Sequence, residues 1–344
     1  MNTLPMIPTQ GPLPVLSPAE IAELHAEIRV LAAQRNATIL AHNYQVPEIQ
    51  DVADYVGDSL GLSRKAGESD AETIAFCGVH FMAETASILC PGKTVLIPDL
   101  EAGCSLAASI DAEQLSEWKA TYPEGVVVMY VNTTAEVKAL TDYCCTSANA
   151  VDVVRHIYDT HGEDTEILFG PDMWLGAYVE KELGRSMHVW DGECHVHAGI
   201  RPSDIEATRA AHPGADFLIH PECGCTTSVM EYVAAGDVSA EGVHMLSTGG
   251  MLRYAGEAER ETTAHPDHRE AVVATEVGML YPLRMAAPDV TFIPANPEAS
   301  CVYMKMITLE KLRDALRDFK YEVRVPPEIA ARARIPIDRM VAIG

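Results

Sequence analysis

The sequence predicts an α/β protein made of three similar units, each with a short parallel sheet, related by a pseudo-threefold axis. Hydrophobic runs bounded by turn residues alternate with amphipathic helical segments, a pattern typical of parallel strands linked by right-handed crossovers. Four kinds of motif also recur three times in the same order, which indicates an internal repeat. Because ligands of such sheets bind beyond the carboxyl ends of the strands, we expect the loops there to point into one central active site.

The first recurring motif is a hydrophobic run that ends in polar residues. Its copies are TILAHNY, VVVMYVN and DFLIHPE, which end at Tyr44, Asn132 and Glu222. The second motif places a hydroxyl at the expected start of a helix. Its copies carry Ser59, Ser147 and the pair Ser247 and Thr248. Such a hydroxyl is either an ordinary N-cap or, beside free backbone N–H groups, part of an anion site.

The third and fourth motifs complete each copy. The third occurs as IAFCGVHFMAE, ILFGPDMWLG and VVATEVGML. The fourth is a loop after a β-like run, and its copies contain Cys104, Cys194 and Cys301. From the first copy to the second, the four motifs are offset by 88, 88, 92 and 90 residues; from the second to the third, by 90, 100, 105 and 107. The third copy therefore carries extra residues after Glu222.

The repeat also predicts the domain organisation. We expect an N-terminal lead at 1–17, a first unit at 18–107, a second unit at 108–197 and a third at 198–302, with C-terminal helices at 303–344 joining the first unit.

The helices follow from amphipathic spacing and capping residues. The first is expected to begin at Ser17, with Pro18 in its first turn and Glu20 completing a capping box. Another is expected at 308–323 with Thr308 as its N-cap, and the tail 326–344 is expected to form two short helices that pack on the first unit. The remaining predicted helices are 48–56, 59–69, 83–89, 111–122, 135–143, 149–162, 174–185, 201–214, 227–236 and 251–261.

The chain is strongly acidic, with 25 basic and 50 acidic residues and a net charge of −25. This balance disfavours nucleic acid and anionic membrane surfaces as partners. An anionic substrate must instead be held by local positive potential. The sequence contains no run of 18 apolar residues, and its start has neither a basic nor an apolar signal region. We therefore expect a cytoplasmic protein.

The nine cysteines fall into groups with different expected roles. The odd count disfavours a disulfide framework, and no CxxC pair supports a zinc ribbon or a ferredoxin-type loop. Only Cys104, Cys194 and Cys301 share one position in the repeat, so we expect them to hold one iron–sulfur cluster. Three thiolates leave the fourth iron of a [4Fe–4S] cluster open to act as a Lewis acid. Cys77 and Cys90 are expected in the core, and the roles of Cys144, Cys145, Cys223 and Cys225 stay open.

Polar residues at the predicted strand ends supply the other candidates. Six of them are expected to face the same cavity: His42, Tyr44, Tyr130, Asn132, His220 and Glu222. Of His195 and His197, one is expected to contact substrate. Asp172, Glu84 and Glu276 in the third motif are weaker candidates. The sequence around Gly249 and Gly250 is not a GxGxxG fingerprint, so no dinucleotide site is indicated.

Several of these segments together resemble the quinolinate synthase A family. They are ILAHNYQVPEIQDVADYVGDSLGLSRKA, GVHFMAE, YVNTTAEVKALTDYCCTSANAV, FGPDMWLG, HPEC and STGGM, and the resemblance extends from about Leu31 to Met340. It implies a triangular assembly of three three-layer α/β/α units with one oxygen-sensitive [4Fe–4S] cluster. It further implies an enzyme of NAD biosynthesis that condenses iminoaspartate, supplied by an aspartate-oxidising enzyme, with dihydroxyacetone phosphate. The products are quinolinate, phosphate and two waters.

The resemblance also implies roles for individual residues. The cluster ligands fall on Cys104, Cys194 and Cys301. Tyr44 assists proton transfer, and Glu222, backed by His220, is the general base. The residues implied to bind substrate are His42, Ser59, Tyr130, Asn132, Ser147, His197 and Thr248.

The sequence departs from the family pattern in its longer N-terminal lead, in the second cysteine and longer spacer of the HPECGC segment, and after Cys301. A CxxC-type pair is absent there, so a redox switch at the last ligand is not supported. Two other functions stay open: a cluster-dependent hydro-lyase acting on a dicarboxylate, and a non-enzymatic iron–sulfur sensor. The sensor is disfavoured because no basic partner-binding segment is present. The protein is expected to be a monomer or a homodimer.

Overall fold

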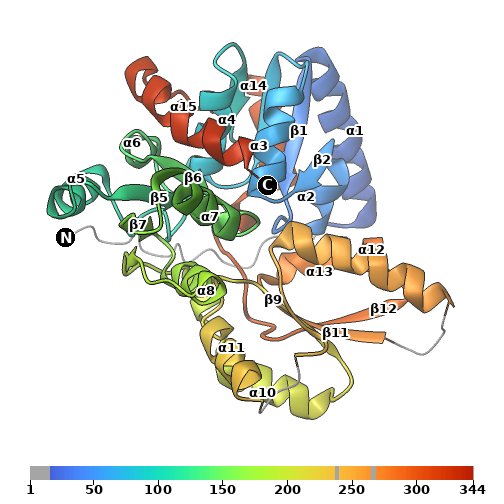
Figure 1. Cartoon of the computed structure of the whole chain (residues 1–344). Coiled ribbons are helices and arrows are strands. Elements are labelled where there is room, and N and C mark those ends of the chain that lie inside the picture. The colour runs from blue at the N-terminus through green and yellow to red at the C-terminus, as the bar shows by residue number, and fades with distance from the viewer. Residues whose placement is uncertain (1–15, 237–239, 265–268, 344) are drawn as a thin grey trace. The chain divides into compact units, whose positions relative to one another are not determined.

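Three four-stranded parallel sheets carry the fold (Figure 1). The computed structural model describes residues 16–236, 240–264 and 269–343, so nearly all of the predicted lead at 1–17 lies outside the described residues. The first sheet contains β1 (Ala37–His42), β2 (Tyr55–Gly57), β3 (Thr73–Cys77) and β4 (Thr94–Leu96). The second contains β5 (Val126–Tyr130), β6 (Tyr143–Cys145), β7 (Ile167–Gly170) and β8 (His188–Val189). The third contains β9 (Asp216–Ile219), β10 (Val243–Met245), β11 (Arg269–Ala274) and β12 (Val290–Pro294).

All three sheets have the same strand order. The orders are β2-β1-β3-β4, β6-β5-β7-β8 and β10-β9-β11-β12, and every pairing with a described register is parallel. The predicted α/β class with three repeated units is therefore confirmed. In each sheet the strand order reverses between the first and the third strand in sequence. Ligands of α/β sheets bind beyond the carboxyl ends of strands at such a reversal, so β1, β5 and β9 lead toward the expected site.

The helices cover these sheets. The region before β8 contains α1 (Pro18–Gln34), α2 (Pro47–Val52), α3 (Ser59–Glu68), α4 (His80–Leu89), α5 (Ala112–Thr121), α6 (Ala135–Lys138), α7 (Ala150–His161) and α8 (Met173–Leu183). The region after β8 contains α9 (His195–Ala198), α10 (Pro202–Ala211), α11 (Thr226–Ala235), α12 (Thr248–Ala264), α13 (Leu280–Ala286), α14 (Leu309–Asp318) and α15 (Pro327–Ala342), with short 3-10 turns at Val277–Met279 and Met304–Met306. Figure 1 shows α12 and α13 on one side of β9, β11 and β12, and α10 on the other.

Three predicted helices end earlier than expected, for one shared reason. The segment 48–56 is helical only to Val52, because 55–57 pair with β1 as β2. The segment 135–143 is helical only to Lys138, and its last residue begins β6. The segment 308–323 is helical to Asp318, after which Glu322 bridges Leu96. Amphipathic spacing continues past each end, but pairing with a strand satisfies the backbone instead.

The tail is also different from the prediction. Instead of two short helices it forms the single helix α15, which contains Pro336. This helix packs on α6, α4 and α3, while α14 packs on α1. The expected capping box at the start of α1 is present, since Ser17 and Glu20 each bond the other's backbone N–H. Thr308 caps α14 as predicted.

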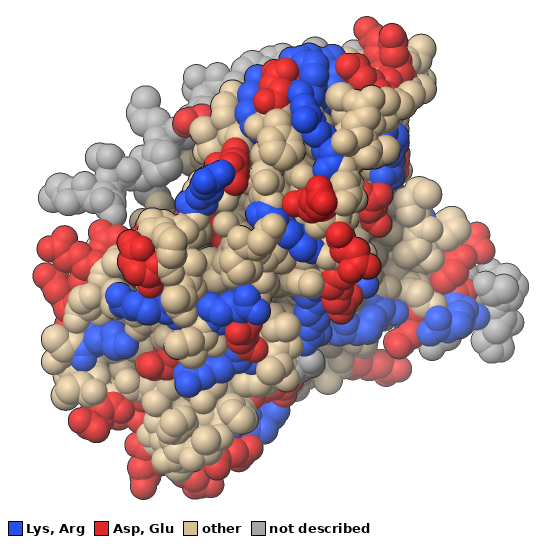
Figure 2. Space-filling model, turned by 90° about the horizontal axis from the view of Figure 1, so that it is seen from above, with Lys and Arg blue, Asp and Glu red and all other residues tan. Residues whose placement is uncertain are grey.

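The described residues group into two compact units. Unit 1 contains the described part of 1–123 together with Val131–Cys144 and Cys301–Ala342, and unit 2 contains Glu124–Tyr130, Cys145–Ser300 and Ile343. These units are defined by contacts and not by the repeat, so the predicted domain boundaries stay a prediction. On the face drawn in Figure 2, acidic and basic side chains are interspersed.

Candidate functional site

In unit 2, three of the predicted residues contact the buried carboxylate of Glu222, and a fourth contacts one of these three. Tyr130, the last residue of β5, donates its hydroxyl to Oε1 of Glu222. The Nδ1 atom of His197 lies 3.3 Å from Oε2, and Nδ1 of His220 lies 3.7 Å from Oε1. The two imidazole rings stack with their centroids 4.8 Å apart, and Ser147 Oγ lies 3.1 Å from His220 Nε2. The structure thus brings these predicted residues into one group.

Burial and hydrogen bonding set the charges in this group. Burial alone would raise the pKa of the Glu222 carboxyl. The neighbouring imidazoles of His197 and His220 act in the opposite direction, and with the hydrogen bonds that the carboxylate accepts they lower this pKa to about 2. Burial lowers the pKa of His220 to about 4, so His220 is neutral near pH 7 and supports Glu222 as a polar neighbour rather than as a cation.

Cys194 lies next to the same group. One ligand atom from each of Cys194, His197 and Glu222 lies within 4.8 Å of the other two, a donor set that can hold a metal ion. The backbone N–H of Cys194 donates to Asp172 Oδ2 at 3.2 Å, while Asp172 Oδ1 caps α8 by accepting from Leu175 N–H. Burial, reinforced by the Glu222 charge, raises the pKa of Asp172 to about 8. Asp172 therefore positions the Cys194 loop, a role that the sequence indicated only weakly.

The hydroxyl residues expected at helix starts lie one or two positions away from the N-caps of α3 and α7, or at the start of α12. Asp58, not Ser59, is the N-cap of α3, and Ser59 is the first helical residue. Asn149 is the N-cap position of α7, two residues after Ser147. At α12 the hydroxyl of Ser247 accepts from Gly250 N–H at 3.2 Å, and Thr248 is the buried first residue of the helix. Each hydroxyl still lies near a helix N-terminus, where backbone N–H groups favour anions.

In unit 1, the residues after β1 form a buried loop. The His42 and Tyr44 rings meet edge to face with centroids 4.6 Å apart, and Tyr44 N–H donates to His42 Nδ1 at 3.2 Å. Lys305 donates to the carbonyl oxygen of Tyr44, which ties this loop to the segment after Cys301. Within the described structure, the buried Oδ1 atom of Asn132 has no hydrogen-bond partner. Because a buried acceptor without a partner is costly, Asn132 is suited to receive a donor from a ligand.

Exposure separates the nine cysteines, all of which lie in described residues. Cys104, Cys194 and Cys301 are partly exposed, and the other six are buried. Burial raises the pKa of the Cys77 thiol above its usual range and that of Cys144 to about 12, which disfavours the thiolate form at both positions. In unit 1, burial and then the charges of Cys301 and Cys104 raise the pKa of Tyr303, which indicates that both thiols lie near this ring. The three cysteines selected by the repeat thus differ from the other six in having partly exposed side chains.

Sequence reasoning missed two residues near these groups. Thr275 follows β11 directly, and its hydroxyl lies 3.0 Å from His197 Nε2. Its place in the third motif could have indicated it. Lys138 in α6 is completely buried, and only its position on an apolar helix face offered a signal.

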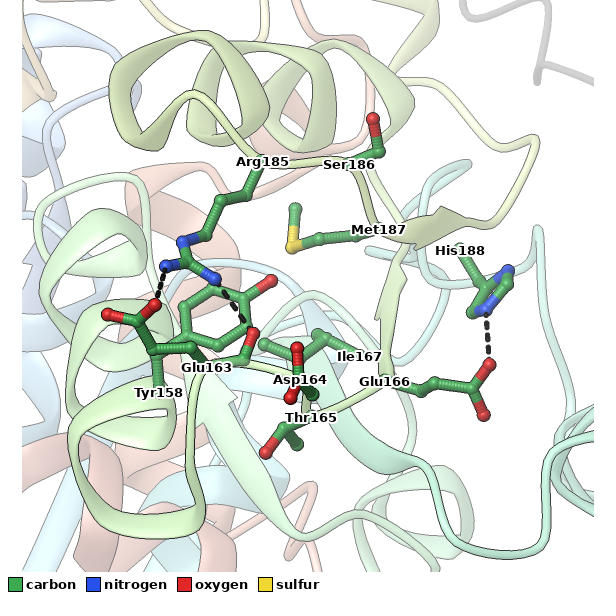
Figure 3. A pocket seen from close by; sticks show the side chains of 10 residues that line it. All are labelled: Tyr158, Glu163, Asp164, Thr165, Glu166, Ile167, Arg185, Ser186, Met187 and His188. Carbon is green, nitrogen blue, oxygen red and sulfur yellow. Dashed lines mark hydrogen bonds and ion pairs between the residues drawn. The ribbon is translucent and has the colours of Figure 1, made fainter.

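A pocket elsewhere in unit 2 lacks these features (Figure 3). It is lined by residues before β7 and β8, where Arg185 pairs with the Glu163 carboxylate at 3.0 Å and His188 lies 3.5 Å from Glu166. These residues lie at the amino ends of the strands, whereas ligands of α/β sheets bind at the carboxyl ends.

Comparison with known proteins decides the family. Residues 26–342 match the family model described as Quinolinate synthetase A protein. The chain belongs to the quinolinate synthetase A family. It is 55% identical over 321 residues to a quinolinate synthase of Thermus thermophilus, a match that covers 93% of this chain and 97% of the relative.

Mycobacterial quinolinate synthases are also similar to this chain, at slightly higher identity. The quinolinate synthase of Mycobacterium sp. strain KMS is 57% identical over 327 residues, covering 95% of this chain and 94% of the relative. That of Mycobacterium tuberculosis strain H37Ra is 58% identical over 320 residues, covering 93% and 88%. The predicted family is therefore confirmed. In the part of the chain that the structure describes, none of the helices has the length and apolar character needed to span a bilayer.

Proposed function

We propose that this protein condenses iminoaspartate with dihydroxyacetone phosphate to quinolinate, releasing phosphate and two waters, as a step of NAD biosynthesis. The chain is an enzyme that forms quinolinate, as its family and its 55–58% identity to quinolinate synthases indicate. The observation that carries the proposed chemistry is the buried group around Glu222. Its carboxylate lies beyond β9 and contacts a tyrosine hydroxyl and two imidazoles.

Glu222 is suited to be the general base. Carbon–carbon bond formation from an enamine requires removal of protons, and a base must be ionised before it can accept one. The lowered pKa of Glu222 keeps the carboxylate ionised, but it also makes it a weak base while its donors stay in place. We infer that substrate draws His197 and Tyr130 away from the carboxylate, which raises its basicity at the moment of reaction. His220 then holds the carboxylate in position.

Other predicted residues would hold the substrates. Tyr44 would assist proton transfer at the edge of the His42 ring, and the unpartnered Oδ1 atom of Asn132 would accept from the intermediate. Carboxylate and phosphate groups need local donors because the net charge of −25 repels them. The starts of α3, α7 and α12, with Ser59, Ser147 and Thr248, offer backbone N–H groups for this purpose.

We further propose that Cys104, Cys194 and Cys301 hold one [4Fe–4S] cluster per chain. The fit rests on their partial exposure, which the six buried cysteines lack, and on the donor set around Cys194. When bound, a cluster with three thiolate ligands supplies an open iron that acts as a Lewis acid toward a leaving hydroxyl. Iminoaspartate is unstable, so an aspartate-oxidising enzyme in the same compartment, which we place in the cytoplasm, would supply it.

The test is anaerobic purification followed by iron analysis and an assay of quinolinate from the two substrates. We expect about four irons per chain, as a [4Fe–4S] cluster requires. Cys104→Ala, Cys194→Ala and Cys301→Ala should each lose iron and activity together. Cys90→Ala is the matched control, because its buried thiol bonds only the carbonyl of Ala66 among the described contacts, and it should keep both. An iron-free wild type with full activity would refute the cluster.

A further inference from the structure

Lys138 is a buried cation that the proposed chemistry does not use. It is 0% exposed and is one of the largest fully buried side chains of the described structure. Lysine is almost never fully buried unless its charge is paired, because removing an ammonium from water costs several kcal/mol. A lysine retained in such a place therefore needs a physical explanation.

The contacts of Lys138 do not neutralise its charge. Its ammonium donates to the carbonyl oxygen of Thr133 and lies 5.4 Å from the centroid of the Phe81 ring. None of the described carboxylates lies within ion-pairing distance of Lys138. Glu84, whose charge acts on Lys138 from beyond that distance, accepts the backbone N–H of Ala135 through Oε2 at 3.2 Å and lies 3.7 Å from His80 through Oε1. The positive charge is thus stabilised by a carbonyl and a ring face, but it forms no ion pair with a carboxylate of the described residues.

The start of α4 connects this cation to the Cys104 loop. Phe81, whose ring the ammonium faces, is the second residue of α4. The first residue, His80, donates its backbone N–H to the carbonyl of Ala102 at 2.7 Å, two residues before Cys104. The loop that contains Cys104 is thus joined to the helix whose Phe81 ring faces the ammonium, so a negative charge on Cys104 would act on Lys138. Burial lowers the pKa of Lys138, while Cys144, Glu84 and Cys104 oppose that shift.

Cys144 is not the missing anion. Burial raises the pKa of its thiol to about 12, so it is neutral near pH 7 even beside Lys138. Cys104 is different because it is partly exposed and is a proposed cluster ligand. A thiolate bound to iron carries a negative charge, which no described carboxylate supplies within ion-pairing distance of Lys138.

We propose that Lys138 is the fixed buried counter-charge of the iron–sulfur cluster on the Cys104 side, and that it raises the reduction potential of the cluster. This inference rests on the proposed cluster. Net charge and burial around a cluster are main determinants of its potential. A cation held in a medium of low dielectric constant favours the more negative, reduced state, and salt screens it little. Lys138 thus acts through the cluster and is not expected to touch substrate.

The test compares Lys138→Met with the wild type, both purified anaerobically with their clusters. Methionine keeps the length and apolar stem and removes the charge. At a fixed applied potential we expect the ratio of reduced to oxidised cluster, read by electron paramagnetic resonance, to fall about tenfold, which corresponds to about 59 mV for one electron. The metal-free variant should unfold at the same or a higher temperature, because a buried charge has been removed.

Lys119→Met is the matched control. Lys119 is in the same unit and also donates to a backbone carbonyl, that of Leu140 at 2.6 Å, but its side chain is 35% exposed. The reduction potential of the cluster in Lys119→Met should equal that of the wild type. Should Lys138→Met fold but lose its iron, Lys138→Arg, which keeps the charge, is expected to retain it.

Three results would overturn the inference. An unchanged potential in Lys138→Met would show that the charge does not act on the cluster. A lower unfolding temperature of the metal-free variant with an unchanged potential would assign Lys138 a structural role. Loss of iron from both Lys138→Met and Lys138→Arg would exclude charge as the cause. A wild type without iron would instead refute the proposed cluster itself, so the two failures are distinguishable.

Discussion

The titratable groups around Glu222 are governed by burial. His220 and Glu222 have only 3% and 2% of their surfaces exposed, and each is stabilised in the form that its neighbours favour: Glu222 as the carboxylate, His220 as the neutral imidazole. A neutral His220 can keep one ring nitrogen toward Glu222 and the other toward Ser147 Oγ. At the scale of single residues, burial and hydrogen bonding therefore keep one ionised carboxylate next to a neutral imidazole and a tyrosine hydroxyl.

We predict that His220 makes the fold sensitive to mild acid. Its folded pKa of about 4 lies below the unfolded value of about 6.5, so between these values the unfolded chain binds more protons. Stability therefore falls as pH decreases from about 6.5 toward 4. From pH 7 to pH 5 the free energy of unfolding should drop by about 2 kcal/mol more in the wild type than in His220→Asn. Urea denaturation of the metal-free protein at the two pH values measures this.

The control is His156→Asn, which removes an exposed histidine of the same unit and should keep the wild-type pH dependence. If His220→Asn and the wild type lose equal stability between pH 7 and pH 5, the buried imidazole is not neutral in the folded state.

Secondary structure elements place the site through strand ends. In each sheet, the strand that comes first in the sequence (β1, β5 or β9) lies between the second and the third strands. The residues that follow it in the chain start at its carboxyl end. His42 ends β1 and Tyr130 ends β5, while His220 directly follows β9. The same local sequence pattern thus places a ring side chain at the carboxyl end of the first strand of each sheet.

At the scale of elements, the N-cap of α1 can be tested by mutation. The Ser17 hydroxyl accepts Glu20 N–H at 3.3 Å, and Glu20 in turn accepts Ser17 N–H at 2.8 Å. Ser17→Ala should lower the free energy of unfolding by about 1 kcal/mol, because the first turn of α1 loses its cap. Ser116→Ala, at an exposed helical position within α5, should change stability by less than about 0.5 kcal/mol. If chemical denaturation gives the same change in the free energy of unfolding for Ser17→Ala and Ser116→Ala, the Ser17 cap does not stabilise α1.

At the scale of the whole chain, arginines of α15 form hydrogen bonds with residues of unit 1 that are far away in the sequence. Arg332 donates to the carbonyl of Ala139 at the end of α6, and Arg339 donates to that of Asp142. Arg334 donates to Leu89 at 2.9 Å and to Ile88 at 3.3 Å. Ile88 and Leu89 are the last residues of α4, where a cation also complements the helix dipole. In this acidic chain, these basic side chains are used to satisfy backbone carbonyls as well as carboxylates.

We predict that Arg334→Met destabilises the fold by about 1.5 to 3 kcal/mol, because it leaves carbonyls at the end of α4 without a charged donor. Arg324 is the matched control, since its side chain is 79% exposed and pairs only with Glu322 among the described contacts. Arg324→Met should have little effect. Thermal unfolding of both variants tests this; an Arg334→Met variant as stable as Arg324→Met would mean that water replaces the lost donor.

By itself the sequence determined the α/β class, the threefold repeat and the capped starts of α1 and α14, because these follow from local period, spacing and residue type. Its selection of Cys104, Cys194 and Cys301 as cluster ligands stays a prediction. It also indicated His42, Tyr130, His220 and Glu222, since strand ends can be read from short segments. Only the tertiary structure decided which side chains contact one another. The ends of three helices, the pKa values around Glu222 and the burial of Lys138 depend on residues far apart in the chain. Burial and pairing are properties of these distant contacts, and no local pattern encodes them.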